Sequence, residues 1–195
     1  MRISILPVAL AMLLIQSVSY AMHHAEDSST KGSDKAGVYV GASAGIAFLG
    51  EGAEPFFGKG YLGFSDGVIG FEVGYFETAM GRSTETTAWA KTRGGDLAIV
   101  LKPFQHSSSP LVESFFLRAG GHYSEVKSGY KYYFWGGPYD ITDNYNGIGY
   151  LAGAGFDLPV NDTLTARLGY NFYGSLGGRG GQDYSAVSAG IQLNF

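Results

Sequence analysis

The chain has 195 residues, enough for one domain of ordinary size, and a formal net charge of −4 from 13 basic and 17 acidic residues. With this charge balance, a basic surface for binding nucleic acid is not expected. The absence of cysteine excludes a disulfide scaffold, a zinc-thiolate site and a cysteine nucleophile. Glycine supplies 31 residues, more than twice the roughly 7% of an average protein, while charged residues reach only 15%. This composition suits a β-rich shell and excludes a chain that is disordered throughout.

Residues 1–21 have the layout of a secretory signal peptide. Met1-Arg2 is a short positive segment, residues 3–15 are apolar apart from Ser4 and Pro7, and Ser19-Tyr20-Ala21 offers small residues at a cleavage site. Thirteen residues are too few to cross about 30 Å of hydrocarbon as a helix. We therefore expect export and cleavage after Ala21.

Residues 22–36 are polar and lack periodicity, so we expect a flexible periplasmic tail before a barrel domain at 37–195. After cleavage, the new amine and His24 in Met22-His23-His24 could bind Cu(II) or Ni(II) in a square plane. The alternative is an ordinary polar tail with incidental histidines, and it is the interpretation adopted here. No metal site and no cofactor are assigned.

Apolar and polar residues then alternate with a period of two in successive segments, as in strands with one apolar face. The last segment shows it most plainly, because Val187, Ala189, Ile191, Leu193 and Phe195 alternate with small or polar residues. Eight such segments occur: 38–48, 57–64, 69–75, 96–102, 115–123, 148–157, 164–172 and 186–195.

The two faces of these strands are inverted relative to a soluble barrel. One face carries Leu, Ile, Val, Phe and Tyr, and the other carries Gly, Ser, Asn, Gln and isolated charges. This pattern predicts an all-β protein, an eight-stranded antiparallel transmembrane up-and-down β-barrel with a polar, plugged interior. The alternative is a lipocalin-like soluble barrel, whose ligand cavity would then be lined by charges in every strand.

The connections alternate in length, as such barrels require. Tight turns are predicted at 65–67 and 159–162 and a connection of moderate length at 105–110, all on the periplasmic side. Longer outward loops are predicted at 49–56, 77–88, 128–146 and 174–183. Aromatic residues near the strand ends predict headgroup-level girdles. They are Tyr61, Phe64, Tyr75, Phe76, Phe104, Phe115, Tyr123, Tyr150, Phe156, Tyr170, Phe172 and Phe195.

Several charges fall on the inward face, where an unpaired charge would be costly. We expect them to meet as a salt-bridge plug, with Lys59 above the level of the others and Asp157 below. A gated ion path along this plug is the alternative. The predicted plug consists of Lys59, Glu72, Asp96, Arg118 and Arg167.

The signal peptide, the eight alternating segments and the final Ile191-Gln192-Leu193-Asn194-Phe195 resemble the OmpA/OmpX-type family of small eight-stranded outer-membrane barrels of Gram-negative bacteria. The resemblance implies a place in the cell outer membrane, among its lipids and lipopolysaccharide. It also implies that Phe195 is the signal read by the barrel-assembly machinery. We expect a monomer.

His122-Tyr123-Ser124 is similar to the H-x-S arrangement of PagL-type lipid A deacylases, which are also eight-stranded barrels. A His base and a Ser nucleophile need an orienting acid and a position facing lipid. Parity places both residues inward unless Gly120-Gly121 forms a bulge, and Glu125 and Asp140 are the nearby acids. We predict no enzyme activity, with a lipid-modifying enzyme as the alternative.

The outward segment 128–146 is rich in aromatic residues, which recur at binding hot spots. We predict surface contact with a host or neighbouring cell, as adhesion or resistance to host defence. The alternatives are a rigid hairpin or girdle, an extension of two strands with a free edge, a purely structural envelope barrel, or a small channel. The candidate recognition residues are Tyr130, Tyr132, Tyr133, Phe134, Trp135 and Tyr139.

Overall fold

The computed structural model describes residues 37–49, 55–78, 81–82, 89–134, 137–176 and 183–195. The predicted signal peptide, the tail with Met22-His23-His24, and Trp135 lie outside these residues. In the described part of the chain, no helix has both the length and the apolar character needed to cross a membrane.

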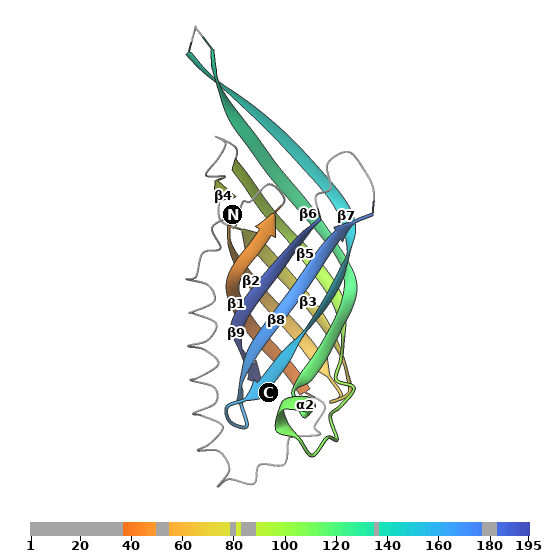
Figure 1. The fold of residues 1–195 in the computed structure, drawn as a ribbon. Coiled ribbons are helices and arrows are strands. Elements are labelled where there is room, and N and C mark those ends of the chain that lie inside the picture. The colour runs from red at the N-terminus through yellow and green to blue at the C-terminus, as the bar shows by residue number, and fades with distance from the viewer. Residues whose placement is uncertain (1–36, 50–54, 79–80, 83–88, 135–136, 177–182) are drawn as a thin grey trace. The chain divides into compact units, whose positions relative to one another are not determined.

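The described residues form one antiparallel sheet that closes on itself (Figure 1). The two-residue β4 pairs with β5 on the side that β3 also occupies, so the barrel wall has eight strands. The strands are β1 (Gly37–Leu49), β2 (Phe56–Ser65), β3 (Ile69–Thr78), β4 (Gly81–Arg82), β5 (Trp89–Leu101), β6 (Phe115–Phe134), β7 (Gly137–Pro159), β8 (Leu164–Ser175) and β9 (Tyr184–Asn194).

Each strand of the wall pairs with the next wall strand along the chain, β3 with β5 included, and the pairing of the first strand with the last closes the ring. β3 pairs with β5 from Ile69↔Leu101 to Glu77↔Arg93. The first and last strands, β1 and β9, pair from Tyr39↔Asn194 onward. The predicted eight-stranded up-and-down barrel is therefore confirmed.

Successive residues of each strand point alternately into and out of the barrel, which explains why polar and apolar residues alternate in the sequence. In β3, Glu72 is 1% exposed and points inward, whereas its neighbour Val73 is 53% exposed and points outward. Glycine on the inner face makes room for large rings: a Cβ at Gly63 would lie 2.2 Å from the Tyr39 ring, and one at Gly41 would lie 2.3 Å from the Tyr61 ring. The polar, tightly filled interior follows from this pairing of small and large residues.

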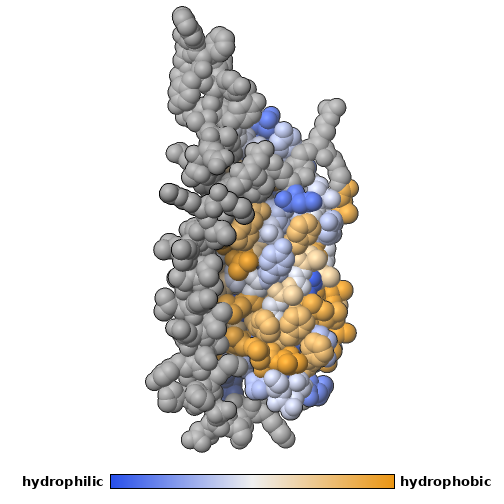
Figure 2. Space-filling view, viewed as in Figure 1, coloured by the Kyte–Doolittle hydropathy of each residue, from blue (hydrophilic) through white to orange (hydrophobic). Residues whose placement is uncertain are grey.

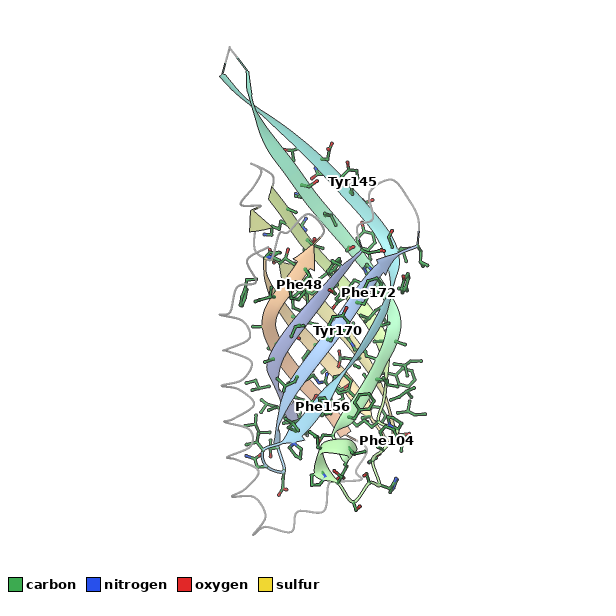
Figure 3. The ribbon with its side chains drawn as sticks, viewed as in Figure 1. Phe48, Phe104, Tyr145, Phe156, Tyr170 and Phe172 are labelled. Atoms are coloured by element: carbon green, nitrogen blue, oxygen red, sulfur yellow. The ribbon has the colours of Figure 1, made fainter. Side chains whose placement is uncertain are left out.

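The outer wall is apolar, and Figure 2 shows apolar side chains across the side of the barrel that faces the viewer. Its exposed residues include Val40, Leu62, Phe71, Val73, Leu97, Ile99, Leu117, Ile148, Ile191 and Leu193. In Figure 3, Phe48 and Phe172 lie near one end of the barrel and Phe104 and Phe156 near the other. This arrangement suits two lipid–water interfaces.

Two residues assigned to the girdles from sequence lie inside instead. Tyr61 is 5% exposed and Phe76 is fully buried. Both occupy inward positions of their strands, and position along the strand alone cannot distinguish a girdle ring from an interior ring. The girdle prediction is therefore wrong for these two residues.

The end of the barrel with the tight connections is called the turn end here. Asp66 Oδ1 accepts hydrogen bonds from the backbone N–H of Val68 and Ile69 in the β2–β3 turn. Asn161 Oδ1 does the same for Thr163 and Leu164 in the β7–β8 turn. Such Asx turns explain why these connections are short.

The β5–β6 connection is longer than the predicted turn at 105–110, because it contains the short helix α2 (Pro110–Glu113). Proline suits the first turn of a helix, where its missing N–H has no intrahelical partner to lose. Ser114 then closes the helix, and both its N–H and its hydroxyl donate to the Pro110 carbonyl.

The opposite end, called the loop end, differs most from the prediction. β6 and β7 remain paired through Phe134↔Gly137, well past the other strands, and form a hairpin that projects from the barrel (Figure 1). The predicted loop at 128–146 is therefore a β-hairpin whose connection is residues 135–136. Local alternation around Tyr130-Lys131-Tyr132 had indicated this alternative.

Candidate functional site

The barrel interior brings together all five residues of the predicted charge plug. Arg118 contacts Glu72 at 2.6 Å and Asp96 at 2.7 Å, and Lys59 contacts Asp96 at 2.8 Å and Glu72 at 3.5 Å. Arg167 contacts the second Glu72 oxygen at 2.5 Å. Glu72 thus lies at the centre of the network, in contact with three cations from β2, β6 and β8.

The network continues toward the turn end through Asp157 and Lys102. Arg167 donates to both carboxylate oxygens of Asp157, at 2.7 and 2.9 Å. Lys102, which the sequence analysis did not single out, contacts Asp157 at 3.1 Å. Because every buried charge here has an opposite partner, the burial penalty of each ion is offset.

Aromatic rings and an amide support the two arginines. The Arg167 guanidinium lies 4.7 Å from the Tyr61 ring centre and 4.8 Å from that of Phe116, at cation–π distance. Arg118 donates to Asn171 Oδ1 at 3.3 Å. The sequence pattern placed Tyr61, Phe116 and Asn171 inward, but it carried no signal that they would surround these cations.

A small cavity of about 20 Å³ lies within the network, which is room for a single water molecule. Its lining includes Tyr61 and Arg118, and among the described residues neither the Tyr61 hydroxyl nor Arg118 Nε has a hydrogen-bond partner. The interior is thus a filled polar core, as expected for a barrel of eight strands.

An aromatic layer lies between the charge network and the loop end. Tyr173 stacks on Tyr184 with ring centres 4.7 Å apart, and Phe76 lies 4.9 Å from Tyr173. Phe57 packs against Phe76 and Tyr173. Sequence reasoning missed this layer because an aromatic ring at a strand end fits the lipid interface equally well.

His122 and Ser124 are both buried in this interior rather than exposed to lipid. The β5–β6 register runs without a bulge through Ala98↔Gly120 and Leu97↔Gly121, so the inward parity holds. The His122 ring lies edge-on to Tyr173 at 5.3 Å, and its Nε2 is 3.3 Å from the Gly174 carbonyl oxygen. Glu125, on the outer side, binds Arg93 instead.

The candidate recognition residues of the outer segment occupy the far part of the hairpin. In backbone register Tyr130 is opposite Ile141 and Tyr132 is opposite Tyr139, while Tyr133 and Phe134 precede the connection. The structure describes the backbone of these residues but not their side chains. Figure 3 places Tyr145 on the same hairpin, above the barrel.

The proposed assembly residue Phe195 ends the last strand at the turn end. Its N–H donates to the Val38 carbonyl at 2.9 Å, and its side chain is 77% exposed. The ring is thus available on the outside of the wall where the first and last strands meet. Within the described residues, no group of three or more His, Cys, Asp or Glu side chains is placed to hold a metal ion.

No family model matches this sequence, and no curated protein matches it. Solved structures do match. The Neisserial surface protein NspA has 18% identity and a TM-score of 0.51, with 81% of this chain and 97% of that chain covered. The attachment invasion locus protein Ail of Yersinia pestis has 10% identity and a TM-score of 0.51, with 82% and 97% covered.

A major outer membrane protein from Thermus thermophilus has 16% identity and a TM-score of 0.54, with 82% of this chain and 99% of that chain covered. At these identities the likeness concerns the fold. With its closed eight-strand wall, polar interior and apolar outer surface, the chain has the fold of the small eight-stranded outer-membrane β-barrels that its sequence resembles.

Proposed function

We propose that this outer-membrane barrel makes contact with a host or neighbouring cell surface through its β6–β7 hairpin, as an adhesin or a factor in resistance to host defence. The loop end faces outward in this proposal, because the short connections of such barrels lie on the periplasmic side. The interior is packed, so we assign recognition to the outside of the molecule.

The length of the hairpin is the observation that carries the proposal. Within the residues that the structure describes, pairing of β5 with β6 extends to Trp89↔Gly129, and pairing of β8 with β7 extends to Gly149↔Ser175. Beyond these points the two strands pair with each other as far as Phe134↔Gly137. A barrel needs no such extension to close, and two strands alone are marginally stable in water.

The hairpin offers a partner two kinds of contact. Among the described residues, 130–134 of β6 and 137–147 of β7 have no second strand beside them, which leaves backbone groups for strand addition. The sequence of this part is rich in Tyr, Phe and Trp, residue types that supply large contact areas at low entropic cost. The name of Ail indicates attachment, but at 10% identity the proposal rests on the hairpin.

Adhesion assays with a hairpin variant test this function. Residues 130–141 are replaced by a short Gly/Ser turn, and cells displaying either protein are applied to epithelial monolayers and to sister cells. We expect adhesion to fall roughly tenfold or more, since the loss of one hot spot costs about 2 kcal/mol or more.

A control variant carries Gly/Ser in place of residues 177–182, which connect β8 to β9 in the sequence, and should adhere like the unmodified protein. All variants must first show the heat-dependent gel shift of a folded barrel. If the folded hairpin variant adheres as well as the unmodified protein on both surfaces, the recognition role is refuted and a purely structural barrel is favoured.

A further inference from the structure

Charged side chains form a compact group on the outer wall, where β3, β5 and β6 approach the loop end. Lys91 binds Glu77, and Arg93 binds Glu125 with its Nε at 2.8 Å and an Nη at 2.6 Å. Lys127 lies 3.4 Å from the other Glu125 oxygen. We call these residues the charged row: Glu77, Lys91, Arg93, Glu125 and Lys127.

The charged row has an excess of positive charge. Lys91 pairs with Glu77, and both Arg93 and Lys127 pair with Glu125. Three cations therefore face two carboxylates, in a protein whose overall net charge is −4. Lys91 and Lys127 are also direct cross-strand partners, and a bound anion would add to the two carboxylates that offset the repulsion between them.

Directly below the charged row, two glycines leave a shallow notch in the apolar wall. Gly95 lies between the exposed rings of Tyr75 and Tyr123 in register. Gly121, the diagonal neighbour of Gly95, lies between Leu97 and Tyr150. We call these six residues the glycine notch.

Neither glycine of the notch is crowded by its neighbours. A Cβ at Gly95 would meet only the Gly74 carbonyl at 3.5 Å, and one at Gly121 only the Gly149 carbonyl at 3.5 Å. Both are ordinary van der Waals contacts, so packing of the wall does not demand glycine at either position.

We propose that the charged row and the glycine notch together bind one phosphorylated glycolipid of lipid A chemistry from the outer leaflet. Its phosphate binds between Lys91 and Lys127, beside Arg93, and one acyl chain lies across Gly95 and Gly121. In a lipid of this kind the phosphate lies at the membrane surface and the acyl chains lie deeper. The charged row is likewise nearer the loop end of the wall than the glycine notch. The proposal rests on the loop end facing outward, but not on recognition by the hairpin.

Native mass spectrometry of the folded barrel in detergent, titrated with bisphosphorylated lipid A, measures this binding. The combined variant Lys91→Gln, Arg93→Gln, Lys127→Gln should bind roughly a hundredfold more weakly at low ionic strength. The opposite change, Glu77→Gln with Glu125→Gln, should strengthen binding because it removes two negative charges from the same surface.

A matched pair of valine variants tests the notch. Gly95→Val fills it, whereas Ala189→Val enlarges a side chain on the outer face of β9, a strand that does not contribute to the notch and does not adjoin β3, β5, β6 or β7. We expect weaker binding only for Gly95→Val, and weaker binding of dephosphorylated lipid A to the unmodified protein. Equal affinities in either comparison would overturn the proposal, as would full competition by inorganic phosphate alone, which would indicate a simple anion site.

Discussion

Replacement of Glu72 by Gln is expected to lower the free energy of unfolding of the barrel by about 3–5 kcal/mol, the usual cost of removing one partner from a buried charge network. Glu72 is the one anion in contact with Lys59, Arg118 and Arg167 together. Its loss leaves three buried cations opposite Asp96 and Asp157. Urea unfolding of the refolded protein in detergent micelles, followed by the gel shift, measures the change.

The same strand supplies a matched control. Glu77→Gln removes a partly exposed carboxylate from the outer wall, where a solvent-screened ion pair contributes little to stability. The double variant Glu72→Gln, Lys59→Gln restores two cations opposite two anions, so it should lose less stability than the sum of the single changes. Equal losses for Glu72→Gln and Glu77→Gln would contradict the central place of Glu72.

Gly94→Val is expected to destabilise the barrel by about 3 kcal/mol or more, at the upper end of overpacking penalties. Gly94 faces inward, and a Cβ there would lie 2.2 Å from the Tyr123 carbonyl oxygen and 2.7 Å from the Phe76 ring. The oxygen belongs to the backbone of the neighbouring strand, so the wall itself must shift. The yield of heat-modifiable protein after refolding is the measurement.

Gly95→Val is the adjacent control. Its side chain points outward over the notch, where the added Cβ makes ordinary contact, so we expect the folded yield of the unmodified protein. If the two neighbouring variants fold equally well, the assignment of inner and outer faces of β5 is wrong.

The wall of the barrel could be predicted from the sequence because a period of two is a property of local residues. The alternation of apolar and polar residues indicates which face of a strand meets lipid, as in Val38 to Phe48 and in Val187 to Phe195. The structure pairs these two segments. Helix α2 could not be found this way. It has only four residues, which is too short for a helical period to appear.

The ends of strands were the least predictable part of the fold. Gly and Asn are frequent in 137–147, which is typical of a loop, yet pairing with β6 makes this segment a strand. The local sequence pattern does not show which residue of β6 pairs with which residue of β7. This cross-strand pairing determines that the segment is a strand.

The residues of the charge network could be predicted from the sequence. The alternation along each strand shows which charged residues point inward, and the burial of such a charge must be offset by an opposite charge. Its geometry was not predictable. Glu72 and Arg167 are 95 residues apart in sequence, and their contact joins β3 to β8, which are not neighbours in the wall. Lys102 was missed for a related reason: it follows β5 in a connection and reaches Asp157 on β7 from there.

The packed interior holds the barrel together, whereas the hairpin is the part that we propose makes contact with another cell. Three buried acids and four cations join strands across the barrel and fill its lumen. The hairpin adds nothing to this closure, since its residues beyond Gly129 pair only with each other in the described chain. Both the proposed cell contact and the proposed lipid site therefore depend on which end of the barrel faces outward.

Cysteine labelling on intact cells tests that orientation most directly, because the chain has no cysteine of its own. Asn144→Cys places a thiol at an exposed position of the hairpin, and Asp162→Cys places one in the β7–β8 turn at the other end. A polymer-linked maleimide too large for porins should label Asn144→Cys on intact cells, and Asp162→Cys only after the outer membrane is permeabilised. Labelling of Asp162→Cys but not Asn144→Cys on intact cells would contradict the account.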